Sequence, residues 1–357
     1  MIITEGQNVS NETKEIKGEL ITFENETYYK IANSDKMRPF FMSIVSDSNH
    51  WMFISSNGGL TAGRKNAEYA LFPYYTDDKI TEMAETTGSK TIFKVFKNGK
   101  IQLWEPFSIR QTGIYKTQTN LYKNRYGNKV VFEENNLDLG LTFRYQWNSS
   151  NQFGFVKKSI LINTSEADVE VTVLDGLQNI LPASVTSDLQ NGRSNLVDAY
   201  KKSELQQEVG LGIYALSAVI VDKAEPSEAL KANIVWSTGL ENPTHLISSL
   251  QLDNFRRGET ITEEVDMKAE KGAYFIVSDI KLNAGESKNW FFVANVNQSI
   301  SDIVQISETI KNRSSLESLI QENIDKGTKQ LIDLAAASDG LQLSADPLIN
   351  MRHFSNT

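Results

Sequence analysis

The sequence contains no cysteine, which excludes a disulfide framework, a thiolate zinc site and a cysteine nucleophile. Histidine is nearly as scarce. His50, His245 and His353 are far apart, and none lies in an HExxH or similar metal-binding spacing. We therefore assign no catalytic residue, no metal ligand and no cofactor. One alternative stays open, a sugar epimerase that uses His50 as its acid, because such an enzyme needs a positioned acid and a carboxylate base.

Positive charge and long apolar runs are also lacking. The net charge is -9, and the densest cationic stretch, residues 116–129, carries only four Lys and Arg. A polyphosphate backbone would be repelled by this field, so nucleic acid is not an expected partner. The first residues have no cationic segment followed by an apolar one, and no window approaches about eighteen apolar residues. With Met1 as the natural start, we expect a cytoplasmic protein with no membrane partner.

What the sequence does contain is alternation of β-branched and aromatic residues with polar ones, from Leu20 to Val296. Asn98-Gly99 lies between two such runs and predicts a two-residue hairpin loop. Phe155–Leu174 is interpreted as one antiparallel hairpin. The clearest predicted strands are residues 51–55, 91–96, 101–104, 141–147, 154–163, 169–174, 210–221, 232–236 and 274–282.

Helical patterns are confined to a few segments. A short helix is expected near residues 194–202, where the alternation stops, and a weaker one at residues 301–311. A final helix begins with a capping box at Ser314 and Glu317 and carries an apolar stripe from Leu316 to Leu334. We predict a mainly β protein, a large antiparallel sandwich followed by C-terminal helices.

Candidate binding residues come from two loop regions. The glycine-rich segment 55–64 has the glycine density of a phosphate loop but lacks the Gly-Lys-Ser/Thr ending and the helix that should follow. It is either a tight turn or a loop that presents Asn57 and Arg64. Aromatic rings beside amide, carboxylate and guanidinium groups suit sugars, since rings stack on pyranose faces while polar groups bond hydroxyls. For each aromatic residue, packing in the core is the alternative. The predicted substrate-binding residues are Trp51, Asn57, Arg64, Tyr74, Tyr75, Asp77, Trp104 and Arg110.

Six segments of the chain stand out as motifs: residues 37–42, 56–64, 70–79, 175–182, 194–201 and 272–275. Together they resemble the N-terminal region of large bacterial proteins similar to cellobiose phosphorylases, and the match covers essentially the whole chain. The resemblance implies a β-supersandwich of the galactose-mutarotase-like type, then linker helices, then an (α/α)6 barrel that carries the catalytic acid.

On this reading residues 1–298 form the sandwich, 299–340 the linker helices and 341–357 the start of the missing barrel. The chain alone is then expected to be inactive, with the barrel and a β-glucoside-type oligosaccharide as partners; a homodimer is left open. The main alternative is a free-standing module that binds carbohydrate or has a structural role. A mutarotase-like enzyme is the third.

Overall fold

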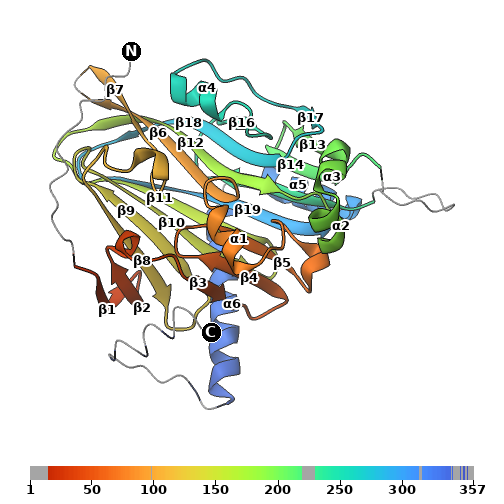
Figure 1. Ribbon diagram of the computed structural model, residues 1–357, viewed down its shortest axis with the longest axis horizontal. Helices are drawn as coiled ribbons and strands as arrows, with labels where there is room; N and C mark the ends of the chain where they lie inside the picture. Colours follow the sequence, from red (N-terminus) through yellow and green to blue (C-terminus); the bar gives the residue numbers. More distant parts are fainter. Residues whose placement is uncertain are drawn as a thin grey trace.

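The computed structural model describes residues 15–97, 99–218, 230–312 and 316–338, with single residues at 340, 346, 349 and 352. Its strands form three sheets whose pairings are all antiparallel (Figure 1). The large sheet has the order β1-β2-β8-β9-β10-β11-β19-β15-β14-β13-β17, the middle sheet β16-β18-β12-β6-β7, and the small sheet β3-β4-β5. The predicted fold class, a mainly β protein built on large antiparallel sheets, is confirmed.

The strands of the large sheet are β1 (Lys17–Phe23), β2 (Glu26–Ala32), β8 (Thr117–Asn124), β9 (Val130–Asn136), β10 (Leu141–Ser150), β11 (Gly154–Asn163), β13 (Lys201–Gln206), β14 (Leu211–Leu216), β15 (Ala232–Thr238), β17 (Asp266–Lys268) and β19 (Ser287–Gln298). The others are β3 (Phe41–Ile44), β4 (His50–Ser55), β5 (Leu60–Arg64), β6 (Gly88–Lys97), β7 (Lys100–Trp104), β12 (Val169–Ile180), β16 (Thr244–Leu246) and β18 (Gly272–Leu282). The α-helices are α1 (Asp77–Glu82), α2 (Ser187–Gly192), α3 (Ser194–Tyr200), α4 (Leu252–Arg257), α5 (Ile300–Lys311) and α6 (Leu316–Ala336), and the short 3-10 helices span Ser34–Lys36, Ala67–Tyr69 and Ile109–Gln111.

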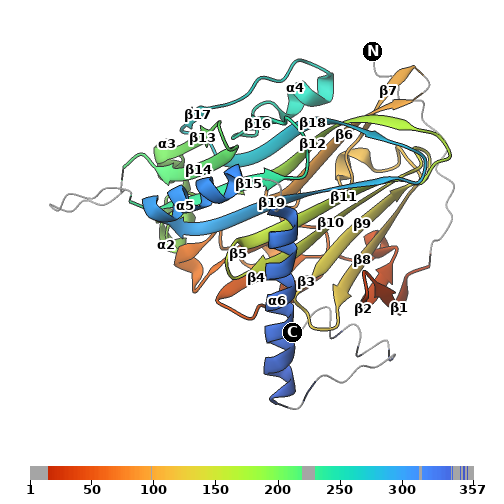
Figure 2. The same ribbon diagram turned by 180° about the vertical axis from the view of Figure 1, so that it is seen from behind.

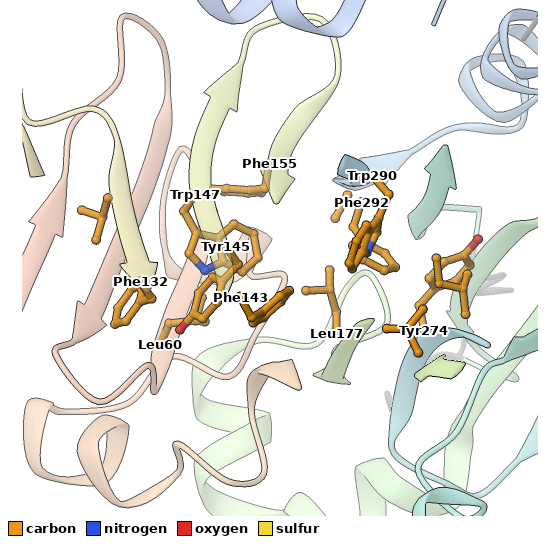
Figure 3. Close-up of a cluster of buried hydrophobic side chains, with 14 of the residues drawn as sticks. Leu60, Phe132, Phe143, Tyr145, Trp147, Phe155, Leu177, Tyr274, Trp290 and Phe292 are labelled. Carbon is orange, nitrogen blue, oxygen red and sulfur yellow. The ribbon is translucent and has the colours of Figure 1, made fainter. Parts of the chain in front are cut away.

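The main core lies between the large sheet and the other two sheets. Figure 3 shows Phe143, Tyr145 and Trp147 of β10 near Phe155 of β11 and Leu60 of β5, with Trp290 and Phe292 of β19 on the side nearer Tyr274. Alternation along each strand directs these rings inward, and burying each large side chain contributes roughly 1.5–3 kcal/mol.

A polar cluster, here called the dry cluster, lies inside this core. The Asp175 carboxylate on β12 is fully buried and accepts hydrogen bonds from Lys157 Nζ at 2.6 Å and Ser159 Oγ at 2.8 Å, both on β11. Thr91 Oγ1 on β6 donates at 2.6 Å and Trp290 Nε1 on β19 at 2.7 Å. The Lys157 ammonium also lies 4.9 Å from the centre of the Phe292 ring. These bonds connect the middle and large sheets and satisfy the buried charge.

The hairpin predicted for Phe155–Leu174 is wrong. Both strands exist, but β11 pairs with β10 and β19 in the large sheet, whereas β12 pairs with β18 and β6 in the middle sheet. The turn between them is a corner of the sandwich, where Asn163 Nδ2 donates to the carbonyls of Ala167 at 2.7 Å and Asn283 at 3.0 Å. The two strands therefore face each other across the core and are not neighbours.

The two-residue hairpin predicted at Asn98-Gly99 is confirmed by the pairing of Lys97 with Lys100 and by the φ of +69° at Gly99, although Asn98 itself lies outside the described residues. The short helix predicted near residues 194–202 corresponds to α3, which ends at Tyr200, directly before β13 begins at Lys201. Of the predicted strand 210–221, β14 covers Leu211–Leu216.

The outer face of the large sheet is covered by α5 and α6. Leu316, Ile320 and Ile324 of α6 and Ile310 of α5 pack on outward-facing side chains of β11, β14, β15 and β19. The predicted helices at 301–311 and 316–334 are thus confirmed. The capping box proposed at Ser314 lies outside the described residues. A capping box is present at Ser299 and Asp302, where it starts α5.

One turn beyond Ile324, Thr328 is still buried and accepts a hydrogen bond from Asn128 Nδ2 at 3.0 Å, and only after it does α6 leave the sandwich. Figures 1 and 2 show the end of this helix extending past the strands in both views. Leu331 and Ile332 are half-buried, and Leu334 is 61% exposed. None of the helices in the described ranges is long and apolar enough to cross a membrane. Most of the predicted segment 341–357, including His353, is outside those ranges, so the predicted domain limits stay predictions.

Candidate functional site

The small sheet collects several of the predicted binding residues on its two faces. Trp51 of β4 lies across Gly63 of β5, where a Cβ atom would meet the indole at 2.4 Å. The indole Nε1 donates to the carbonyl of Asn66 at 3.1 Å. A glycine at position 63 is therefore required for the ring to lie over the neighbouring strand, and the hydrogen bond fixes its orientation.

Trp51 belongs to a set of partly exposed rings that we call the aromatic row: Phe41, Phe53, Trp51 and Tyr74. The Phe41 and Phe53 ring centres are 5.5 Å apart, those of Phe53 and Trp51 6.1 Å, and those of Trp51 and Tyr74 5.5 Å. Tyr74 is 41% exposed. The structure thus brings the predicted residues Trp51 and Tyr74 together at the surface, with two phenylalanines that the sequence did not single out.

Asn57 and Tyr75 have structural partners. Asn57 Nδ2 donates to the carbonyl of Thr81 in α1 at 2.9 Å, and the turn approaches that helix so closely that a Cβ at Gly59 would lie 2.0 Å from the carbonyl oxygen of Ile80. The Tyr75 hydroxyl accepts from Gln190 Nε2 of α2 at 3.1 Å. The glycine-rich segment is accordingly the tight turn that the sequence left as one alternative, and it holds α1 against the small sheet.

Arg64 lies on the opposite face of the small sheet from Trp51 and holds three amides. Its Nε donates to Asn49 Oδ1 at 2.7 Å, Nη1 to Asn295 Oδ1 at 3.2 Å, and Nη2 to Asn151 Oδ1 at 3.3 Å. Burial lowers the pKa of Arg64 from its usual value, yet a guanidinium stays charged at neutral pH. One cation therefore orients amide side chains from three separate segments.

His50 pairs with Arg64 across β4 and β5, and its environment does not suit an acid. Burial, with a smaller effect of the Arg64 charge, lowers the pKa of His50 to about 3. Its Nδ1 lies 2.8 Å from Ser48 Oγ, and its ring meets Phe155 edge-on at 5.0 Å. The imidazole is neutral near pH 7 and has no proton to give as an imidazolium.

Next to the amides held by Arg64 is a polar pocket of about 260 Å³, which we call the seam pocket. It lies between α6 and two turns of the sandwich. Asn323 of α6 is fixed there, because its Oδ1 accepts from Ser150 Oγ at 2.6 Å. Gly327 brings the helix so near the β3–β4 loop that a Cβ would lie 3.0 Å from Asp47 Oδ1. The lining residues are Asp47, Asn151, Gln152, Asn323, Lys326, Gly327 and Gln330.

The remaining predicted residues do not join either place. Trp104 is 0% exposed, stacks on Phe93 and donates from Nε1 to Glu134 at 2.8 Å. It is a core residue, and neither face of its ring is open to a sugar. Arg110 is exposed in the 3-10 helix Ile109–Gln111. The side chain of Asp77, at the start of α1, is outside what the structure describes.

The seam pocket was missed by sequence reasoning. Asn151 and Gln152 are in the turn between β10 and β11, and asparagine in a turn is ordinary. Asn323 is 173 residues from its partner Ser150. The available signals are Asn323, Lys326 and Gln330, polar residues three and four apart on one side of α6, with Gly327 inside the helix, which usually has a packing reason.

Comparison with known proteins finds no matching family model and no matching curated protein. Solved structures with similar folds include a bacterial glucoamylase complexed with acarbose (9% identity, 88% of this chain and 40% of that chain, TM-score 0.38). Another is a protein from the human microbiome described as a kojibiose phosphorylase (12% identity, 88% of this chain and 39% of that chain, TM-score 0.40). A third is a protein from Klebsiella pneumoniae described as an aldose 1-epimerase (10% identity, 83% of this chain and 91% of that chain, TM-score 0.35).

The chain thus spans about two fifths of the glucoamylase and of the kojibiose phosphorylase. At these TM-scores the architecture rests on the strand pairings of the chain itself. What those pairings and the side chains define is an antiparallel β-sandwich that carries an aromatic row on one side of its small sheet, and amides held by Arg64 beside a polar pocket on the other.

Proposed function

We propose that this chain is a non-catalytic sandwich domain of a carbohydrate-active enzyme, of the β-glycoside phosphorylase or hydrolase type. In this role it supports a catalytic (α/α)6 barrel and contributes to the binding of a β-glucoside-type oligosaccharide. The resemblance of the sequence motifs to proteins similar to cellobiose phosphorylases supports this enzyme class. A cytoplasmic location belongs to the same proposal.

The observation that carries the supporting role is the division of α6 into two parts. Its first turns bury Leu316, Ile320 and Ile324 on the large sheet, which fixes the direction of the helix. Its last turns extend past the strands with Leu334 61% exposed (Figure 2). A helix anchored in this way is a rigid connector, and its outer apolar residues suit contact with a further domain.

The chemistry of the pocket agrees with binding and not with turnover. Glycosidases flank the scissile bond with two carboxyl groups, one acting as an acid. The seam pocket is lined by one carboxylate, Asp47, together with amides and a lysine. Such groups bond hydroxyls without cleaving a glycosidic linkage.

The size of the natural protein tests this proposal. An antibody raised against this chain should detect, in the source cell, a protein several times heavier than 40.1 kDa. In that protein Leu334→Lys should lower phosphorolysis or hydrolysis of β-glucosides, while the same change leaves the isolated chain equally stable. A single band at 40.1 kDa would contradict the proposal, as would release of glucose or glucose 1-phosphate by the purified chain alone.

A second candidate, a free-standing carbohydrate-binding module, is favoured by the aromatic row. Sugar faces stack on partly exposed rings, and Tyr74 beside Trp51 offers two of them. Binding of β-glucan oligosaccharides that is lost in Trp51→Ala and Tyr74→Ala, in a natural protein of 40.1 kDa, would select this candidate. Retained binding in both variants would remove it.

The third reading, a mutarotase-like epimerase, depends on His50 as an acid. A histidine with its pKa lowered to about 3 is neutral at physiological pH, so the structure gives no support to that role.

A further inference from the structure

The geometry points to the seam pocket as a binding site for one neutral sugar unit, held between α6 and the sandwich. This inference deepens the proposed function and rests on it for the class of ligand. It concerns residues that the sequence did not single out, and it does not involve the aromatic row.

The first step is the unused hydrogen-bonding capacity of the pocket. The side chains of Asp47, Lys326 and Gln330 form no hydrogen bond or ion pair with any residue that the structure describes. Asn151 uses its Oδ1 to accept from Arg64, which leaves its Nδ2 as a donor. One carboxylate acceptor and several donors thus border the same cavity. A sugar hydroxyl both donates and accepts, and this mixture of groups matches it.

The second step is the charge of the pocket. Asp47 and Lys326 contribute one negative and one positive charge, and the Arg64 guanidinium is engaged with three amides. An anion such as phosphate would be repelled by Asp47, and a divalent cation would find a single carboxylate beside an ammonium. The residues that border the cavity therefore favour a neutral polyhydroxyl ligand.

The third step is size and preorganisation. A volume of about 260 Å³ is below the roughly 300–1,000 Å³ typical of drug-sized ligand pockets, and it suits one sugar ring. Two of the lining residues are held in place, since Asn323 is bonded to Ser150 and Asn151 to Arg64 before any ligand arrives. Fixed polar groups lose less conformational entropy on binding.

The fourth step is position. Asn323, Lys326 and Gln330 belong to α6, whereas Asp47 and Asn151 belong to turns of the sandwich. A sugar unit in the pocket would bond to both, and would hold the helix against the sandwich. Occupancy is thereby coupled to the position of α6, the same helix that extends past the strands.

Gly327 provides a test that does not weaken the helix. Replacing it with alanine puts a Cβ 3.0 Å from Asp47 Oδ1, so the carboxylate has to move away from its present position. Alanine is a better helix former than glycine, so α6 itself is not destabilised. Gly327→Ala should therefore reduce sugar binding while keeping or raising the thermal midpoint of unfolding.

The experiment measures binding of glucose, xylose, galactose and cellobiose to the purified chain by saturation-transfer difference NMR and calorimetry. We expect dissociation constants of about a millimolar, weakened about tenfold or more by Asp47→Asn, Lys326→Ala and Gly327→Ala. Lys329→Ala, an exposed lysine on the same helix, is the matched control and should bind like the unmodified chain. Hydrogen exchange should slow in residues 316–336 when sugar is present.

Three outcomes overturn the inference. The first is that none of the four sugars binds, and the second is that binding persists unchanged in Asp47→Asn and Lys326→Ala. The third is that binding is lost instead in Trp51→Ala, which assigns the sugar to the aromatic row. None of these binding results bears on the mass or the activity of the natural protein, which test the proposed function. A failure of this site is thereby distinguishable from a failure of the proposed function.

Discussion

Two polar regions of this protein differ in what surrounds them. In the dry cluster, Asp175 and Lys157 are both fully buried and bonded to each other and to side chains from both sheets. In the seam pocket, the side chains of Asp47 and Lys326 border open space and bond to no described residue. The first arrangement satisfies every charge with protein groups. The second leaves that capacity available to a ligand, so the same residue types contribute to stability in one place and to recognition in the other.

The largest expected effect comes from breaking the dry cluster. Lys157→Met leaves the Asp175 carboxylate buried without its counter-charge, which should lower the free energy of unfolding by about 3–5 kcal/mol. Urea titration measures the loss. Lys158→Met, the next residue on β11, whose partner Glu24 is exposed, is the control and should cost less than about 1 kcal/mol. A loss of that small size for Lys157→Met would mean that the pair is not a major part of the core.

A second effect, which builds up over several pH units, is expected from acid at His50, near the seam pocket. The pKa of His50 is lowered to about 3 in the folded chain, against 6.5 as the ordinary value. Between these values the unfolded chain binds a proton that the folded chain does not. His50 therefore costs no stability above pH 6.5. As the pH drops from 6.5 toward 3, its titration lowers the free energy of unfolding by up to about 1.4 kcal/mol per pH unit.

His50→Gln separates this effect from other titrating groups. The stability difference between the original chain and the variant should shift in favour of the variant as the pH falls from 7 to 4, when both are measured by urea titration at each pH. A constant difference across that range would show that His50 is protonated in the folded chain as readily as in water.

The next effect concerns the fixed wall of the seam pocket. Asn323→Ala removes the hydrogen bond from Ser150 Oγ and should lower the free energy of unfolding by about 1 kcal/mol. Glu322→Ala, exposed on the same helix, should change it by less than about 0.5 kcal/mol. Equal values for the two variants would indicate that the contact between Asn323 and the turn does not anchor α6.

The smallest effect on stability is expected at Lys326, in direct contrast to Lys157 of the dry cluster. Lys326→Ala should leave stability within about 0.5 kcal/mol of the original, because the ammonium has no partner among the residues that the structure describes. Thermal unfolding in the absence of sugar is the measurement. A loss above about 1 kcal/mol would mean that Lys326 is bonded within the protein, and that the pocket is less open than its geometry indicates.

The fold could be predicted from the sequence to the level of strands, and their partners only where a two-residue turn joins them, as between β6 and β7. The alternation in residues 154–163 and 169–174 correctly located β11 and β12, yet it could not tell that the turn at Asn163 moves the chain to another sheet. Alternation reports which side chains are buried. It carries no information on which strand lies alongside, and that is decided by long-range pairing.

The candidate site was predictable in part for a similar reason. Trp51 and Tyr74 were found because aromatic and polar residues cluster there along the chain, and the same criterion selected Trp104, which is in the core. The seam pocket combines turns near residues 47 and 151 with residues 323–330 of α6. Its residues have common types and no local spacing, so only the folded chain brings them together.

The position of β19 in the large sheet has a consequence for synthesis of the chain on the ribosome. This strand, Ser287–Gln298, lies between β11 and β15, both of which precede it in the sequence. Until it emerges, a nascent chain holds two partial sheets with unpaired edges and an incomplete core. Such edges invite pairing with other chains, so the last of the described strands to be translated is also the one that protects the earlier ones from aggregation.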